Sequence, residues 1–139
     1  MGTRSLTKIY DGDTLLVTLY AQYDGYMSGH GKDLAEILQG KTLVNGYQSR
    51  EQAAFNGPGC MAASIIAGLK KGIGGYYIQA PEDSDDYVDY VYTFRCNTEG
   101  TGFDMKYAGP TVTVTSYGDI VFAGTLPEFC DAAMAPEEF

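Results

Sequence analysis

The sequence is poor in basic residues, and this shortage excludes one class of partner. Nine lysines and arginines stand against eighteen aspartates and glutamates, which gives a formal net charge of −9. Proteins that hold nucleic acid without regard to its sequence need clustered lysine and arginine to displace counterions from the phosphates. We therefore expect no bulk binding of DNA or RNA.

Cysteines and long apolar runs are also scarce. Cys60, Cys96 and Cys130 are an odd number at wide spacing, so neither a disulfide framework nor a paired-cysteine metal site is expected. No run approaches the roughly 18 apolar residues of a membrane-spanning helix, and the first residues do not resemble a secretory signal. These absences favour a cytoplasmic protein without metal, cofactor or membrane contact.

The residues that are present suit one folded unit. Of the 139 residues 45% are hydrophobic, and twelve tyrosines and six phenylalanines add bulk, so one core can form without disulfides or metals. The patterns predict an α+β fold: a single antiparallel sheet of about five to seven strands with two helices packed on one face. We expect one domain over residues 1–127 and a loose C-terminal tail over residues 128–139.

The order of the elements follows from local patterns. Two runs of strand-forming residues, 4–10 and 14–23, flank Asp11-Gly12-Asp13, which is typical of a hairpin turn. Helical spacing follows over 28–39 and again over 60–71, with a helical stretch that opens at Ser49 as a capping box with Gln52. Alternation and turn residues then predict five strands, at 76–79, 88–96, 103–107, 111–115 and 120–123. The predicted order is ββααβββββ.

The link between the second strand and the first helix gathers residue types that bind ligands. Glycines at a helix start let backbone N–H groups approach a ligand, and the helix dipole favours negative charge there. His30 and Lys32 add donors, Asp24 adds an acceptor, and two tyrosines offer flat apolar surface. The candidate ligand-binding residues of the link are Tyr23, Asp24, Tyr26, Ser28, Gly29, His30, Gly31 and Lys32. Such a set suits a small anionic molecule with a planar ring.

A structural interpretation of the same residues is equally open. Glycines beside a tight strand-to-helix turn are often required by backbone geometry alone, and His30 could simply cap or pack. The aromatic row of Tyr90, Tyr92 and Phe94 could likewise stack nucleobases, although a row covered by helices is more often core. Arg95, on the opposite face of that strand, could clamp an anion, but a cross-strand ion pair is the commoner outcome.

A second glycine-rich helix start precedes Cys60. The helix dipole would stabilise its thiolate, which makes Cys60 a candidate nucleophile, while a buried cysteine would behave as a small hydrophobe. His30 is the only histidine and so the only imidazole base. The enzymatic alternative is thus a small hydrolase or transferase that uses His30 with Asp24 or Cys60.

The acidity is concentrated over residues 82–89. This run lacks the spaced acids, central glycine and terminal glutamate of a calcium-binding loop, so a solvated loop is the simplest interpretation. Its charge also allows a third function, an acidic protein-interaction inhibitor that targets a basic surface.

Two segments carry a resemblance. The opening Met1-Gly2-Thr3-Arg4-Ser5-Leu6-Thr7 and residues 24–31, with sequence DGYMSGHG, resemble a family of short uncharacterised proteins from phage and bacterial genomes. The likeness is clearest over about the first forty residues. It implies a cytoplasmic setting, that of the bacterial host if the gene belongs to a phage. It implies no catalytic residue, but it draws attention to Arg4 and to residues 24–31.

The leading hypothesis from these observations is non-enzymatic binding of a small anionic, nucleotide-like ligand. In a phage, such a protein could act by sequestering a host signalling molecule. An exposed hairpin edge would also permit pairing into a homo-oligomer.

Overall fold

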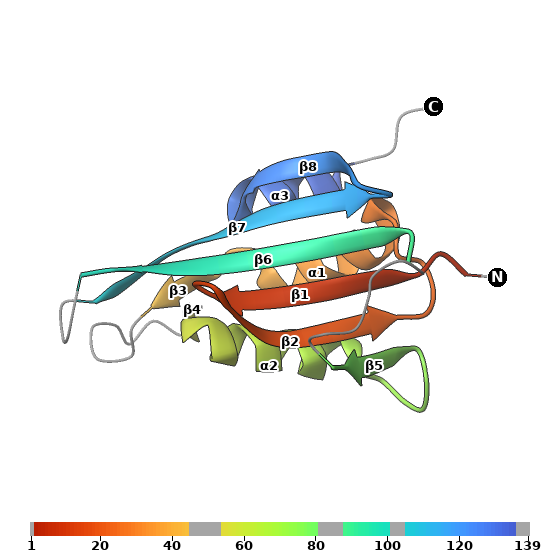
Figure 1. Ribbon diagram of the computed structural model, residues 1–139, viewed down its shortest axis with the longest axis horizontal. Helices are drawn as coiled ribbons and strands as arrows, with labels where there is room; N and C mark the ends of the chain where they lie inside the picture. Colours follow the sequence, from red (N-terminus) through yellow and green to blue (C-terminus); the bar gives the residue numbers. More distant parts are fainter. Residues whose placement is uncertain (1, 45–53, 81–87, 101–104, 136–139) are drawn as a thin grey trace.

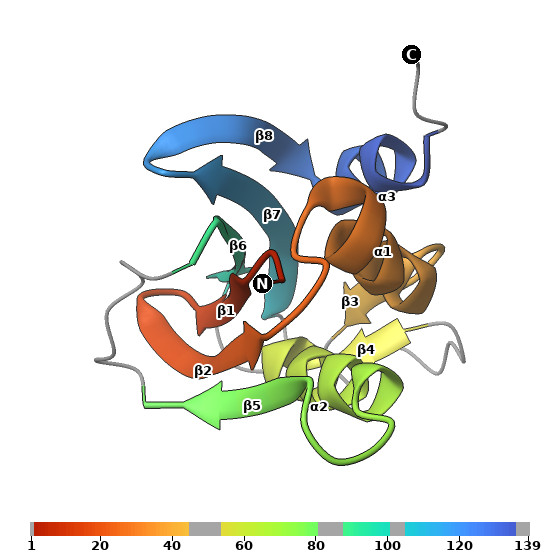
Figure 2. The same ribbon diagram turned by 90° about the vertical axis from the view of Figure 1, so that its right-hand side faces the viewer.

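The computed structural model describes residues 2–44, 54–80, 88–100 and 105–135. These residues form a six-stranded sheet, a two-stranded sheet and three α-helices, and the helices lie on one side of the curved six-stranded sheet (Figures 1 and 2). The strand order is β5-β2-β1-β6-β7-β8. The strands are β1 (Ser5–Asp11), β2 (Thr14–Ala21), β5 (Tyr76–Gln79), β6 (Tyr90–Glu99), β7 (Lys106–Ser116) and β8 (Asp119–Thr125).

The predicted α+β class is confirmed, and the sheet is mixed rather than purely antiparallel. Neighbouring strands of the large sheet are antiparallel except for β1 and β6, which run parallel at its centre. In the sheet, β2 and β5 lie on one side of β1, and β6 lies on the other. The chain forms two helices, α1 (Lys32–Leu38) and α2 (Gly57–Leu69), before it crosses from one side to the other. Side chains alternate with the same period in parallel and antiparallel strands, so the alternation pattern could not distinguish the two.

The helices differ from the prediction in number and order. A π-helical turn, η1 (Met27–Gly31), leads into α1 (Lys32–Leu38), and α2 (Gly57–Leu69) follows later. Between them lie β3 (Thr42–Val44) and β4 (Ala54–Asn56), a small parallel pair that local patterns did not indicate. The predicted capping box at Ser49 and Gln52 lies outside the described residues.

The prediction of a loose tail over residues 128–139 is wrong for its first part. Helix α3 (Leu126–Met134) begins with a capping box in which the Thr125 hydroxyl accepts from the Glu128 N–H at 3.3 Å. The Glu128 carboxylate in turn accepts from the Thr125 N–H at 2.9 Å. Phe129 is fully buried and packs edge-on against Phe94. The Thr125-x-x-Glu128 spacing, with Pro127 in the first turn, is a helix-start signature that the prediction of a loose tail overlooked.

The core lies between the helices and the sheet. The predicted aromatic row belongs to it, because Tyr92 and Phe94 have no exposed surface. The sheet contributes Ile9, Leu19, Tyr92, Phe94, Val112 and Val114, and the helices contribute Leu34, Leu38, Met61, Ile65 and Phe129.

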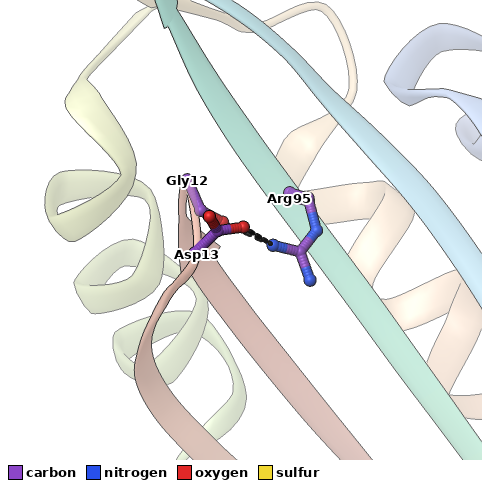
Figure 3. Close-up of polar contacts among 3 residues, drawn as sticks. All are labelled: Gly12, Asp13 and Arg95. Atoms are coloured by element: carbon purple, nitrogen blue, oxygen red, sulfur yellow. Dashed lines mark hydrogen bonds and ion pairs between the residues drawn. The ribbon is translucent and has the colours of Figure 1, made fainter.

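Arg95 stabilises the β1–β2 hairpin rather than an anion. Its Nη1 donates to the Gly12 carbonyl oxygen at 2.5 Å and lies 3.5 Å from the Asp13 Oδ1 (Figure 3). Its guanidinium carbon also lies 4.1 Å from the centroid of the Tyr10 ring. An ion pair was expected as the commoner outcome; the pair that forms joins β6 to the turn between β1 and β2, not to a neighbouring strand.

A candidate ligand-binding cleft

His30, the leading sequence-predicted ligand donor, lies in the interior of the protein. Its side chain is 1% exposed, and its Nε2 lies 2.7 Å from the Thr7 Oγ1 on β1. The imidazole packs edge-on against Tyr92, with ring centroids 5.0 Å apart. It also contacts the Tyr76 ring, which is tilted by 39° with its centroid 5.9 Å away. The prediction that His30 faces a ligand is therefore wrong in this structure, because its own β-sheet surrounds it.

The backbone donors at the start of the first helix are also used within the protein. The N–H groups of Gly29 and Gly31 donate to the Tyr26 carbonyl oxygen at 3.0 and 3.3 Å, and the His30 N–H donates to the Asp24 carbonyl oxygen at 2.7 Å. These are the amides that the sequence had suggested for an anion. All three N–H groups already donate to the carbonyl oxygens of Tyr26 or Asp24, so these three groups do not form an anion-binding site.

Close packing explains the glycines of the segment. A Cβ at Gly29 would lie 2.4 Å from the Asp24 carbonyl oxygen, and one at Gly25 would lie 2.8 Å from the Ser5 Cβ. The Gly25 carbonyl oxygen accepts from the Tyr92 hydroxyl at 2.7 Å. The structural interpretation of these glycines is thus supported.

The remaining predicted residues lie around this turn. The backbone N–H of Arg4 donates to the Asp89 carboxylate at 3.0 Å, and the Asp24 carboxylate accepts from the Tyr26 hydroxyl at 3.2 Å. Tyr26 and Ser28 line a separate hollow of about 360 Å³ beside α3. Lys32 is exposed at the start of α1. Asp89 also accepts from the Tyr117 hydroxyl. Of the predicted acidic loop over 82–89, residues 82–87 lie outside the described residues.

A cleft of about 790 Å³ opens next to the predicted segment. Figure 2 shows the link that leaves β2 rising from near α2 and β5 to the start of α1. Of the sequence-predicted site residues, only Tyr23 is part of the cleft lining. The described lining residues are Tyr23, Asp33, Glu36, Ile37, Gly68, Leu69, Lys71, Gly72, Ile73, Gly74, Gly75 and Tyr76.

Two walls of the cleft carry opposite charges. Asp33 and Glu36 come from α1, while Lys71 comes from the loop between α2 and β5. Burial, followed by the nearby carboxylates of Glu36 and Asp24, raises the pKa of Asp33. Lys32 acts in the opposite direction and lowers this pKa. A positive or hydrogen-bond-donating group placed in the cleft would stabilise the ionised carboxylate further.

The glycine-rich loop opposite α1, at residues 70–75, is held by hydrogen bonds. Lys70 Nζ donates to the carbonyl oxygens of Gly74 at 2.8 Å and Tyr76 at 2.9 Å. The Gln22 N–H donates to the Gly75 carbonyl oxygen at 2.8 Å, and both Gly74 and Gly75 have positive φ. The sequence patterns predicted a helix over 60–71 and no candidate ligand-binding residue in this loop. In the sequence, Gly72, Gly74 and Gly75 directly follow Lys70 and Lys71.

Two tyrosines provide the aromatic surface of the cleft. Tyr23 is 57% exposed, and Tyr76 is half-buried with its ring against His30. Burial, followed by the carboxylates of Asp33 and Asp24, raises the pKa of the Tyr76 phenol. The Tyr76 hydroxyl therefore stays protonated at neutral pH and can donate a hydrogen bond. His30 lies behind this wall rather than in the cleft.

His30 and Cys60, one of the two pairs of the enzymatic alternative, are not brought together. Cys60 is exposed in the first turn of α2, whereas the cleft is formed by Gly68 and Leu69 at the other end of that helix. His30 is buried under Tyr76 and contacts Thr7 instead. No imidazole–thiol pair therefore forms between these two residues.

Three further findings bear on function. Within the described ranges, no three His, Cys, Asp or Glu side chains gather in a way that could hold a metal ion. In the same ranges, each helix is too short or too polar to cross a membrane. No protein-family model, curated protein or solved structure matches this chain at a significant level.

Proposed function

We propose that the protein binds a small nucleotide-like molecule in the cleft between α1 and the loop at residues 70–75, without changing it chemically. The observation that carries this proposal is the pairing of an acidic wall with a lysine- and glycine-rich wall across one cleft that also contains two tyrosines. A nucleotide has groups that match each part: hydroxyl and amino donors, an anion, and a planar ring.

Each wall has a role in this proposal. The carboxylates of Asp33 and Glu36 accept hydrogen bonds from hydroxyl or amino groups of the ligand. Lys71 and the backbone of the glycine loop attract its anionic group, since glycines let a ligand approach the main chain closely. Tyr23 contributes an exposed ring for stacking. The volume of about 790 Å³ lies within the usual range of small-molecule sites.

Binding rather than catalysis is supported by the chemistry of the lining. The described lining residues offer carboxylates, phenols and one ammonium group, but no imidazole, thiol or aliphatic hydroxyl. Nucleophile pairs of the serine–histidine or cysteine–histidine kind are therefore missing from the described lining. In the phage setting that the sequence resemblance implies, binding without turnover would remove a host signalling molecule from solution.

A thermal-shift panel tests the proposal. Nucleoside mono- and diphosphates, cyclic nucleotides, the matching nucleosides and inorganic phosphate are each added to the full chain. At a ligand concentration 100 times the dissociation constant, linkage stabilises the folded state by about 2.7 kcal/mol. For a domain of this size that corresponds to a rise in Tm of roughly 10 °C. Failure of every nucleotide to raise the Tm at millimolar concentration would overturn the proposal.

Variants locate the binding. Lys71→Ala and Asp33→Asn should each lower the affinity for a nucleotide that binds, because each removes a charged group from one wall of the cleft. Lys106→Ala is the matched control, since Lys106 is an exposed lysine at the start of β7, at the end of the sheet away from β5 (Figure 1). Chromatography of the nucleotide after long incubation should show it unchanged. Conversion to a product would contradict the non-enzymatic part of the proposal.

A further inference from the structure

An apolar pocket adjoins the cleft. Its volume is about 330 Å³, and it lies between the last turns of α2 and the strands β2 and β5. The lining residues are Leu19, Ile66, Leu69, Lys70, Tyr76, Tyr77 and Ile78. Leu69 and Tyr76 also line the cleft, so the two spaces share a wall.

The one charged residue of this pocket presents only its hydrocarbon stem. The Lys70 ammonium group is held by the carbonyl oxygens of Gly74 and Tyr76 and lies 5.4 Å from the centroid of the Tyr77 ring. Lysine commonly buries its methylenes while its charged end is bound elsewhere. A polar group that entered the pocket would therefore lose its hydrogen bonds to water without finding new ones, which is unfavourable.

From the adjacency of the two spaces we infer that the ligand of the proposed function is an anionic amphiphile, whose polar part occupies the cleft and whose hydrocarbon ring enters the pocket beside Tyr76. This inference rests on the proposed function for the polar part alone. A bare nucleobase does not suit the pocket, because the polar atoms of its edges would be left unpaired there. A hydrocarbon substituent on a nucleotide-like molecule does suit it, since burial of apolar surface is favourable.

Charge and position support a single occupant for both spaces. Lys71 lies on the cleft side, where it can meet an anion, and Tyr76 stands between the two spaces. The exposed side of the pocket is formed by Ile78, which is 60% exposed on the edge strand β5. A molecule with a hydrocarbon ring beside an anionic group would place the ring in the pocket that Ile78 lines and the anion in the cleft that Lys71 lines.

The probe for this inference is anilinonaphthalene sulfonate, a dye with an aromatic hydrocarbon ring and one anionic group. We expect the folded chain to bind the dye at one site with a rise in fluorescence. Ile78→Asn and Lys71→Ala should each weaken dye binding by roughly fivefold or more. Ile120→Asn is the matched control, because Ile120 is 67% exposed on β8, the opposite edge strand of the sheet. That variant should bind the dye as the parent chain does.

A second variant keeps the test decisive if Ile78→Asn disturbs the edge strand. Ile66→Phe adds volume within the pocket and should also exclude the dye, while near-ultraviolet circular dichroism verifies that the chain is folded. Dye affinity that neither Ile78→Asn nor Ile66→Phe lowers would overturn the inference, as would an equal loss with Ile120→Asn.

The outcomes separate this inference from the proposed function. Nucleotides that stabilise the chain but neither displace the dye nor respond to the pocket variants would leave the proposed function standing and overturn the inference. Dye binding that depends on Ile78 and Lys71, with no nucleotide binding, would support the amphiphile site and reject a nucleotide-like ligand.

Discussion

Lowering the pH from 7.5 to 5.0 should destabilise the protein through His30 alone by an amount that can be worked out. The imidazole is buried, its Nε2 pairs with the Thr7 Oγ1, and its Nδ1 has no hydrogen-bond partner in the described structure. Burial lowers the pKa of His30 from 6.5 to about 4. In the unfolded chain the ring is in water and keeps its ordinary pKa.

The sign follows from proton binding in the two states. Between pH 6.5 and pH 4 the unfolded chain binds a proton at His30 and the folded chain does not, so the free energy of unfolding falls as the pH falls. The contribution is fully present above pH 6.5. It is reduced by about 2 kcal/mol at pH 5 and by roughly 3 kcal/mol once the pH passes below 4. This is a large part of the stability of a small domain.

Urea unfolding of the parent chain and of His30→Gln at both pH values isolates the effect. Carboxylates also titrate over this range, but they do so in both proteins, so the difference in pH dependence reports His30. We expect the parent chain to lose about 2 kcal/mol more than the variant between pH 7.5 and 5.0. Equal losses would refute the reasoning. His30 is the only histidine, so a nuclear magnetic resonance titration of its ring offers a direct check of the pKa.

Three further substitutions test the packing. Gly29→Ala should lower the free energy of unfolding by roughly 1–3 kcal/mol, because its Cβ would lie 2.4 Å from the Asp24 carbonyl oxygen. Its control, Gly59→Ala on the exposed start of α2, meets no atom within 4 Å and should stabilise by about 0.5 kcal/mol. Phe129→Ala should cost about 3–5 kcal/mol in urea unfolding, and a loss below 1 kcal/mol would mean that α3 does not close the core. Thr125→Ala should cost about 1 kcal/mol by removing the cap of α3, and an unchanged melting temperature would contradict that role.

The candidate site shows where local sequence patterns stop being informative. Residues 23–32 were selected because their types suit a ligand, and the structure does contain a cleft at one end of this segment. The histidine and the three amides nevertheless turned inward. Residue type does not reveal which side of a turn faces solvent, because that depends on what packs against it. For His30 the packing partners are Thr7, Tyr76 and Tyr92, which are distant in the sequence.

The sequence by itself determined the elements that local interactions specify. The β1–β2 hairpin, the helical segment over 28–39, the β5 strand and the β7–β8 hairpin all follow from turn residues and side-chain period. The α+β class follows from their order.

Only the tertiary structure decided the parallel pairing of β1 with β6, the folding of the C-terminal segment onto the core as α3, and the position of the cleft. Each joins segments that are far apart along the chain: the cleft combines Tyr23, the α1 residues around Asp33, and the loop that ends at Tyr76. Such contacts depend on which surfaces the whole chain can bury together, and no local pattern records that choice.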